Sequence, residues 1–346
     1  PVVVPAPRRP FFSLSPLNQR RWRNFKKNRR AYWSLWIFAI LFGLSMCAEL
    51  IAYDKPILVR YQSQFYTPIW NFYAETDFGG DFQTEASYRD PEVECLIVSG
   101  GLESCFDDPA GVIEDAQDGV VDGEPINKGW TIWPLIPYSF DTAVDRPGAA
   151  PLAPNVINWQ WVERRGPDIP YLWLLPAEER GENLLGTDGT KRDVMARVVH
   201  GFRLSVLFTL IVTGASAFVG IIAGAIQGYF GGRTDLIFQR VIEIWSSTPS
   251  LYVIIIMFAI LGRSFWLLVF LLILFGWTGL VGVVRAEFLR ARNLEYVRAA
   301  RALGVSNLTI MFRHMLPNAM VATLTMLPFI ITGTIGTLAG LDFLGF

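Results

Sequence analysis

The sequence predicts an all-α polytopic membrane protein with a small extracytoplasmic domain, α+β or loop-rich, inserted after the first span. Hydrophobic residues make up 52% of the 346 residues and charged residues only 18%, and the mean hydropathy is +0.33. Five stretches are apolar enough to cross a bilayer. The net charge is only −1, yet basic and acidic residues are segregated along the chain. This composition excludes a disordered chain, a collagen and a nucleic-acid-binding protein.

Each of the five apolar stretches has the roughly 20 residues that a helix needs to cross a hydrocarbon core. They lie at 33–52, 204–229, 241–261, 265–284 and 319–340. Each could instead be a buried helix of a large soluble protein, but five such stretches with few internal charges favour membrane spans.

Lys and Arg residues beside the spans predict their orientation. The tail, residues 1–32, holds nine basic residues and no acidic one, so we expect it in the cytoplasm. Residues 53–186 hold 8 basic and 23 acidic residues, which predicts an outer domain over 53–187. The loop 285–318 holds six Arg residues against two Glu residues and is expected in the cytoplasm.

Residues 188–203 are basic, although this topology places them outside. Thr190 and Asp193 have the spacing of a capping box. Apolar residues then recur on one helical face, at Val194, Met195, Val198, Val199 and Phe202. We therefore expect a short amphipathic helix over 188–203 that lies on the outer lipid surface before the second span.

The outer domain is rich in Pro and aromatic residues, which favours loops and short strands over long helices. These residues are Trp130, Trp133, Pro134, Pro137, Tyr138, Trp159, Trp161, Tyr171 and Trp173. They are expected to form the domain's own core, and the alternative is that some of them form a docking surface for a soluble partner.

Cys95 and Cys105 bracket a short loop of the outer domain. In an oxidising compartment they could form a disulfide, which would stabilise the domain by ~3 kcal/mol. Cys47 lies within the first span and is expected to be a packing residue. The acidic run 114–124 suggests calcium, but its spacing does not match an EF-hand loop, so we favour a solvated turn and expect no metal site.

The motifs of several kinds of active site are absent from the sequence. There is no P-loop, no HExxH and no GxSxG motif, and the only two histidines are His200 and His314. The chain is therefore expected to bind no cofactor, and any energy for its work must come from a partner.

Residues 295–320 have the pattern of a helical hairpin. Val297 and Leu303 continue one helical register, Gly304 can adopt the positive φ that ends a helix, and Ser306 or Asn307 can cap the next helix.

The second helix of the hairpin has its own apolar pattern. Leu308, Phe312 and Met315 recur on one face, and Pro317 is expected to close this helix before the membrane. Such a compact basic hairpin is a candidate docking element.

This loop resembles the EAA loop of ABC importer permeases. The match rests on AARALG at 299–304 and on LP at 316–317, with eleven residues between the two. Arg298 stands where Glu is usual in that motif, and His314 where Ile is usual. Four segments are similar to the dipeptide and oligopeptide branch of this family, namely RAARALG, RHMLPN, LDFLGF and LLGTDGTKRDVMARVVHGFRLSV. In the last of these, Lys191 stands where Gly is usual. The resemblance covers residues 184–346.

The N-terminal half resembles one subgroup of that branch, whose importers have a large outer segment and carry microcin C and other peptides. The matching segments are SPLNQRRWRNFKKNRRAYWSLWIF, AELIAYDKPILV and WPLIPYSFDT. The resemblance implies a sixth span after Phe346. Because the sequence also begins at Pro1 without Met, we expect these residues to be less than the whole protein.

The resemblance implies a type I ABC importer permease of the bacterial inner membrane, which forms a pathway for peptides and is not itself an enzyme. The implied partners are a second permease subunit in a heterodimer, ABC ATPase subunits that hold ATP and Mg, and a periplasmic peptide-binding protein. Residues 53–203 would then be periplasmic.

The same resemblance assigns ATPase coupling to one set of loop residues. These are Arg298, Ala299, Ala300, Arg301, Gly304, Arg313, His314, Leu316 and Pro317. Small side chains would let the first helix enter a groove, and the Arg residues would pair with acidic groups at its rim. The alternative is a solvated basic loop that only obeys the positive-inside bias.

Two further groups of residues lie in the spans. Ser216, Gly220, Gly224 and Gly228 form a small-residue stripe, which packs either within the chain or against a partner permease. Glu243 is expected to form a local ion pair with Arg240. The alternative is that the polar group at this point lines the pathway, as Glu243, Ser246, Ser247, Thr248 and Pro249.

Two other functions compete with an ABC permease. A secondary transporter or channel would need paired intramembrane charges or inverted repeats, which we do not find. A membrane-tethered ligand sensor would need only one or two spans. Co-purification with ATPase subunits distinguishes the three.

Overall fold

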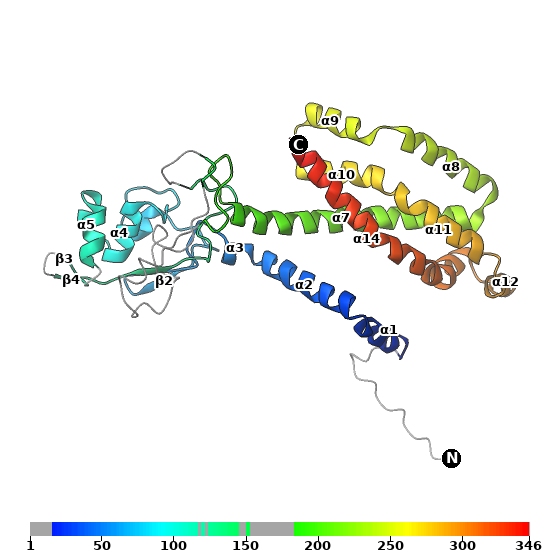
Figure 1. Cartoon of the computed structure of the whole chain (residues 1–346), viewed down its shortest axis with the longest axis horizontal. Helices are drawn as coiled ribbons and strands as arrows, with labels where there is room; N and C mark the ends of the chain where they lie inside the picture. The colour runs from blue at the N-terminus through cyan, green and yellow to red at the C-terminus, as the bar shows by residue number, and fades with distance from the viewer. Residues whose placement is uncertain (1–15, 117–118, 122–123, 145–149, 153–182, 346) are drawn as a thin grey trace, which may run out of the picture. The chain divides into compact units, whose positions relative to one another are not determined.

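The computed structural model describes residues 16–116, 119–121, 124–144, 150–152 and 183–345 (Figure 1). The chain divides into two compact units, Pro1–Arg203 and Leu204–Phe346. Three predictions of the sequence fall wholly or partly outside the described residues. They concern the aromatic residues at 159, 161, 171 and 173, part of the acidic run, and anything beyond Phe346.

The first unit begins with helices. Helix α1 spans Pro16–Lys27, and α2 spans Arg29–Met46 after Asn28, whose side chain accepts a hydrogen bond from the Ala31 amide at 3.4 Å. Cys47 then separates α2 from the short helix α3, Ala48–Ile51. The first expected span, 33–52, is therefore divided between two helices.

The globular part of the first unit combines short strands with short helices. Strand β1 (Leu58–Tyr61) is flanked by antiparallel β2 (Gln64–Tyr66) and β5 (Trp130–Ile132), and β3 (Val120–Val121) pairs with β4 (Glu124–Pro125). The helices are η1 (Glu75–Phe78), α4 (Pro91–Ser99), η2 (Glu103–Phe106) and α5 (Pro109–Ala116). A small α+β domain is thus present within the predicted range, residues 53–187.

The core of this domain is largely aromatic. Phe78 is completely buried and its ring meets those of Tyr61 and Tyr88 edge to face, at centroid distances of 5.5 and 5.7 Å. Trp133 belongs to the same cluster. Tyr138 is also buried, whereas Trp130 is half-buried. The described aromatic residues that we expected in the core therefore do contribute to it, except that Trp130 remains partly accessible.

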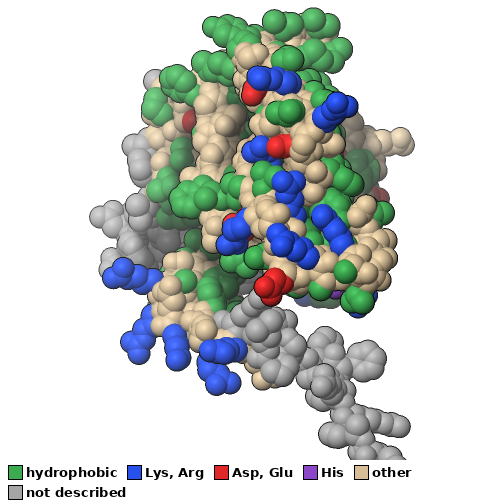
Figure 2. All heavy atoms as spheres, turned by 90° about the vertical axis from the view of Figure 1, so that its right-hand side faces the viewer, with side chains coloured by type: hydrophobic (Ala, Val, Ile, Leu, Met, Phe, Trp, Pro, Cys, Tyr) green, Lys and Arg blue, Asp and Glu red, His purple; other side chains and the backbone are tan. Residues whose placement is uncertain are grey.

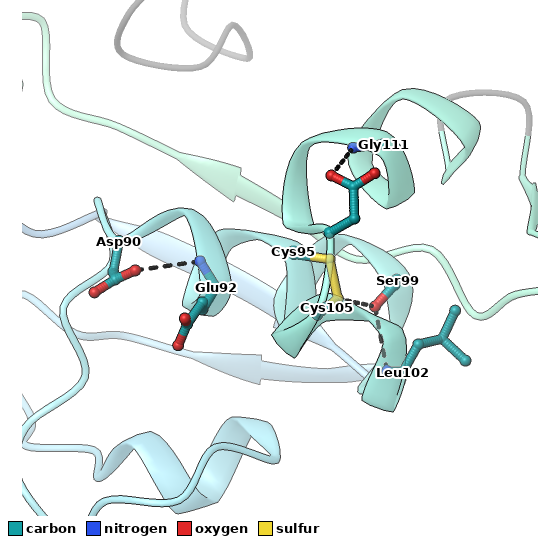
Figure 3. Close-up of a disulfide and its surroundings, with 8 residues drawn as sticks. Asp90, Glu92, Cys95, Ser99, Leu102, Cys105 and Gly111 are labelled. Carbon is teal, nitrogen blue, oxygen red and sulfur yellow. Dashed lines mark hydrogen bonds between the residues drawn. A yellow bond between two sulfur atoms is a disulfide. The ribbon is translucent and has the colours of Figure 1, made fainter.

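Cys95 and Cys105 form a disulfide that joins α4 to η2 (Figure 3). Both residues are fully buried, and their Cα atoms are 5.6 Å apart. The hydroxyl of Ser99 lies 3.4 Å from the Cys105 sulfur and accepts a hydrogen bond from the Leu102 amide at 3.3 Å. The third cysteine, Cys47, lies between α2 and α3 and is exposed, so it is not buried within this chain as a packing residue would be.

The acidic run does not form a cation-binding loop in the part that the structure describes. Glu114 and Asp115 belong to α5, and the residues after the gap form the β3–β4 hairpin. No group of three His, Cys, Asp or Glu side chains within the described ranges is placed to hold a metal ion.

A turn centred on Asp188 leads into the longest helix. The Asp188 carboxylate accepts hydrogen bonds from the amides of Thr190 and Arg192 at 2.8 and 2.9 Å, from the Thr190 hydroxyl, and from Arg197. Burial alone would raise the pKa of this carboxyl, but the hydrogen bonds outweigh it and lower the pKa from 3.8 to about 2.

The predicted separate amphipathic helix over 188–203 is absent. Helix α7 instead runs without a break over Val194–Phe230. Asp193, rather than Thr190, caps it, because its Oδ1 accepts a hydrogen bond from the Ala196 amide at 2.7 Å. No proline interrupts the 37 residues that follow, so the amphipathic segment and the second span share one helix.

The first unit also holds α3 against the first turns of α7. His200 Nε2 lies 2.8 Å from the Ala52 carbonyl oxygen, and Arg203 donates to both carboxylate oxygens of Glu49 at 2.7 and 2.9 Å. These contacts fix the point at which the globular domain is inserted between the two helices.

The second unit is helical. After α7 it contains α8 (Gly232–Ser247), α9 (Ser250–Leu261), α10 (Phe265–Gly276), α11 (Thr278–Ala291) and α12 (Glu295–Ala302), followed by the three-residue α13 (Asn307–Thr309), a π-helical turn η5 (Ile310–Met315) and α14 (Leu316–Phe343).

Among the described residues, three helices are long and apolar enough to cross a membrane. They are Val194–Phe230, Phe265–Ala291 and Asn307–Phe343, and the bent pair Gly232–Ser246 and Ser250–Leu261 makes a fourth if it forms one span. The expected straight span 241–261 is thus bent by 64°. Pro249 explains the bend, because a proline disfavours helical geometry at the preceding residue, and Thr248 is extended at ψ 123°.

Candidate functional site

The loop that resembles a coupling element forms a hairpin of α12, a turn and α13–η5. The turn depends on Gly304, whose φ is +74°. The amides of Gly304 and Val305 donate to the carbonyls of Arg301 and Ala300 at 3.0 and 3.1 Å, which closes the end of α12. Ser306 then caps α13, accepting a hydrogen bond from the Thr309 amide at 3.4 Å.

The inner face of the hairpin is buried against α7 and α11. Val297 from α12 and Ile310 and Met311 from η5 are almost fully inaccessible. They form one cluster with Ala225 and Tyr229 of α7, with Val284, Phe288 and Ala291 of α11, and with Met315 and Ala319. The hairpin is therefore packed against two helices of the second unit, in addition to its covalent connections at both ends.

The outer face of the hairpin presents apolar and basic side chains. Leu303, beside the turn, is 83% exposed, and Leu308 is 67% exposed. Phe312 and Arg298 are also exposed. Figure 2 looks onto the end of the second unit that carries α12 and shows Lys and Arg side chains beside hydrophobic ones there.

The second helix of the hairpin differs from the expectation in two respects. Leu308 and Phe312 face outward while Met315 is buried, so the three residues do not share one face, because η5 winds as a π-helix instead of an α-helix. Pro317 does not close the helix. It lies in the first turn of α14, which continues directly from η5, so the helix runs on through Pro317 to Phe343.

The other predicted coupling residues divide between the two faces. Arg298, Ala299, Gly304 and Arg313 are exposed, and Ala300 and Leu316 pack against the buried cluster. His314 is half-buried, and its carbonyl accepts a hydrogen bond from Asn318 at 3.3 Å. The guanidinium of Arg301 lies over the ring of Tyr229, 5.0 Å from its centroid.

The small-residue stripe of α7 packs within the chain. A Cβ atom added at Gly220 would lie 2.5 Å from the Trp277 carbonyl oxygen, and one at Gly224 would lie 2.8 Å from that of Val281. At Gly228 the corresponding distance to the Arg285 carbonyl oxygen is 2.6 Å.

Ser216 continues this stripe towards the next helix. Its Oγ would lie 2.9 Å from a Cβ added at Gly276, the last residue of α10. The stripe was expected to pack either within the chain or against a partner permease. The structure shows packing within the chain, since the backbone of α7 closely approaches that of the α10–α11 segment.

Comparison with known proteins identifies the family. Residues 217–346 match the profile of the binding-protein-dependent transport system inner membrane component, and residues 15–68 match that of the N-terminal TM domain of oligopeptide transport permease C. The chain is 52% identical over 343 residues to the peptidoglycan transport system permease protein YejE of Agrobacterium fabrum, covering 98% of this chain and 81% of that protein.

This chain belongs to the YejE family of ABC importer permeases. It is also 46% identical to the inner membrane ABC transporter permease protein YejE of Escherichia coli, over 96% of this chain and 82% of that protein. The oligopeptide permease OppC of Lactococcus lactis (strain IL1403) is 38% identical over 165 residues, which is 47% of this chain and 56% of that protein. The predicted branch is confirmed.

The chain is therefore a permease subunit of an ABC peptide importer in the inner membrane. Subunits of this family are not enzymes themselves, because the ATPase is a separate subunit. The helical character of the second unit and its apolar helices agree with this family.

The polar group near the third expected span lies on the surface of the permease's second unit. Glu243 forms an ion pair with Arg240 at 2.6 Å, and both side chains are exposed. Ser246, Thr248 and Pro249 are exposed at the bend between α8 and α9. Ser247 donates to the carbonyl of Ile244 at 2.7 Å.

Three interactions of the permease were not predicted from the sequence. Arg285 of α11 donates to both carboxylate oxygens of Asp235 on α8, at 2.5 and 2.7 Å. Gln239 donates to the buried Gln227 at 3.0 Å.

The third interaction links α7 to the hairpin, since the Tyr229 hydroxyl donates to Asn307 Oδ1 at 2.6 Å. The partners are 12 to 78 residues apart along the chain, and local periodicity contains no signal for such pairs.

Proposed function

We propose that residues 295–315 are the element through which separate ATPase subunits drive this permease. The observation that carries the proposal is the division of the hairpin into two faces. Its inner face is buried against α7 and α11, while its outer face exposes Leu303 and Leu308 beside basic residues. An element of this kind can contact a moving ATPase subunit on one face and transmit the displacement to α7 and α11 on the other.

The proposed topology follows the charge distribution. The tail and the hairpin lie in the cytoplasm, α2 and α3 form the first span, and residues 53–203 lie in the periplasm. The Cys95–Cys105 disulfide supports an oxidising compartment for the domain that contains it. The hairpin and the domain would then lie on opposite sides of the membrane.

The proposed partners are a second permease subunit, ATPase subunits that hold ATP and Mg, and a periplasmic binding protein that delivers the peptide. The family description itself includes dependence on a binding protein. Large apolar side chains exposed on α8, α9 and α14 support burial of those faces in lipid or against the second permease.

The exposed group at the α8–α9 bend, 243–249, is the proposed contribution of this chain to the pathway. A bend exposes backbone groups that a straight span would satisfy internally, and such a segment is stable in a membrane where it lines a polar space. The cargo is a peptide. The relative from Agrobacterium is named a peptidoglycan transport permease, which makes peptidoglycan peptides one class to test, and transport of microcin C stays a prediction.

The decisive test uses Gly304→Asp in the chain co-expressed with its permease, ATPase and binding-protein partners. Nothing lies within 4 Å of the Cβ position of Gly304, which is exposed, so the new carboxylate stands on the accessible side of the hairpin, although the positive φ strains any side chain there. We expect normal insertion but loss of the ATP hydrolysis that cargo-loaded binding protein stimulates.

Gly232→Asp is the matched control, since Gly232 also has a positive φ, +54°, and nothing near its Cβ position. Normal stimulated hydrolysis in Gly304→Asp, or an equal loss in both variants, would remove the hairpin from the coupling role. Transport by the chain without any ATPase subunit would favour a secondary transporter.

A further inference from the structure

Tyr229 lies where the last turn of α7 meets both arms of the hairpin. Its side chain is 4% exposed. The hydroxyl donates a 2.6 Å hydrogen bond to Asn307, the first residue of α13, and the ring lies beneath the guanidinium of Arg301 in α12. One side chain of α7 therefore contacts the segments before and after the turn at Gly304.

The packing of α7 against α11 restrains the position of Tyr229. Gly228 precedes it, at the point where α7 approaches α11 too closely for any side chain. Phe288 of α11 packs in the same cluster and is fully buried. Tyr229 is thus attached to a rigid helix pair and has little freedom to follow an independent movement of the hairpin.

The rest of the interface between the hairpin and the helix pair is mainly apolar. Side chains such as Met311 and Met315 adapt to a changed neighbourhood, because methionine is unbranched and flexible. Apolar contacts of this kind oppose separation of the hairpin from α7 and α11, but they permit the hairpin to slide along these helices, since they have no directional requirement. A hydrogen bond and a cation–π contact do depend on direction.

We infer that Tyr229 is a positioning residue that fixes the register of the hairpin on α7, so that rotation or displacement of one is transmitted to the other. This inference rests on the proposed coupling role of the hairpin. Arg301 is exposed, as are Arg298 and Arg313, but its guanidinium also lies over the Tyr229 ring, so it contacts α7 from the accessible side of the hairpin.

Tyr229→Phe tests the inference, because it removes the hydroxyl and keeps the ring under Arg301. Loss of one hydrogen bond of this kind shifts a local equilibrium about two- to tenfold. We expect amide hydrogen exchange in residues 295–315 to rise by that factor and the number of peptides transported per ATP hydrolysed to fall. Assembly with the ATPase and the melting temperature should stay unchanged.

Three variants complete the experiment. Asn307→Asp keeps an acceptor for the Tyr229 hydroxyl and should preserve coupling, whereas Asn307→Leu should reproduce Tyr229→Phe and add nothing to it in the double variant. Tyr252→Phe removes a hydroxyl from a side chain that α9 exposes, and should change neither readout.

The two readouts separate this inference from the proposed function. If wild-type hydrolysis proves independent of the hairpin, the coupling role fails, and hydrogen exchange still reports whether Tyr229 fixes the hairpin. Unchanged exchange in Tyr229→Phe overturns the inference. So does a loss of coupling that Tyr229→Phe and Tyr252→Phe share, or one that comes with a lower melting temperature.

Discussion

The globular domain and the helical unit of this permease both bury apolar side chains, but their closest packing contacts differ. The domain packs large aromatic rings around Phe78 and is closed by a disulfide. The helical unit places glycines and hydroxyl side chains where helices α7 and α11 meet, and it exposes large apolar side chains such as Ile244 and Phe329. The exposed apolar side chains of the helical unit support its proposed burial in lipid or against another subunit, since exposing such a surface to water is costly.

The largest expected effect comes from a charge placed on the exposed face of the helical unit. Phe329 lies near the middle of α14 and is 74% exposed, so Phe329→Arg would place a guanidinium in the bilayer, at a cost of about 2.5–3.5 kcal/mol. We expect a strong loss of membrane-inserted protein, measured by alkali extraction and by fluorescence of a fused reporter.

Phe82→Arg is the counterpart in the globular domain, where Phe82 is 62% exposed. If water surrounds this residue, the change should alter stability by no more than about 0.5 kcal/mol. Equal losses in the two variants would contradict the assignment of different surroundings, and a loss confined to Phe82→Arg would indicate a partner surface on the domain.

The second largest effect is expected from removal of the disulfide, which tests whether the two units unfold independently. The Cys95–Cys105 bond closes a loop with a sequence separation of 10 residues, so replacing both cysteines by Ala should destabilise the domain by about 3 kcal/mol. We expect amide exchange to accelerate in α4 and α5 and to remain unchanged in the second half of α7. Cys47→Ala is the control and should change neither. Faster exchange throughout both units would show that they do not unfold independently.

The smallest effect concerns the glycine stripe. Gly228→Ala forces the new methyl group against α11 and should destabilise the helical unit by about 1–3 kcal/mol, observed as a lower melting temperature in detergent. Gly282→Ala is the control, because nothing lies within 4 Å of its Cβ position and alanine favours the helix. A similar melting temperature for the two variants would mean that the stripe tolerates separation of the helices.

Local sequence patterns predicted many elements of this chain because the physical signal for them is local. Apolar length identified the helices of the second unit, and Gly304 identified the turn of the hairpin. The pattern failed where two elements join without a boundary signal. The segment 188–203 was separated from the span after it, yet Asp193 starts one continuous helix.

The candidate site was predicted in part for the same reason. The sequence located the hairpin, but it did not indicate which face of each helix is buried. Leu303 is apolar and follows the helical register, so it was not singled out as an exposed residue beside the turn, and the contact of the exposed Arg301 with the Tyr229 ring was not predicted. A leucine adjacent to a turn glycine is a signal that could have identified the exposed tip.

Hydrophobic length and charge bias predicted a membrane protein, the order of its helices and the position of the domain along the sequence, because both act along the chain, and motif resemblance predicted the family. Neither indicated which contacts hold these parts together. The pairing of Tyr229 with Asn307 depends on how α7 packs on α13, and that of Asp235 with Arg285 on how α8 packs on α11. Such pairs form between residues 50 to 78 positions apart, where packing in three dimensions, and no local pattern, sets the distance.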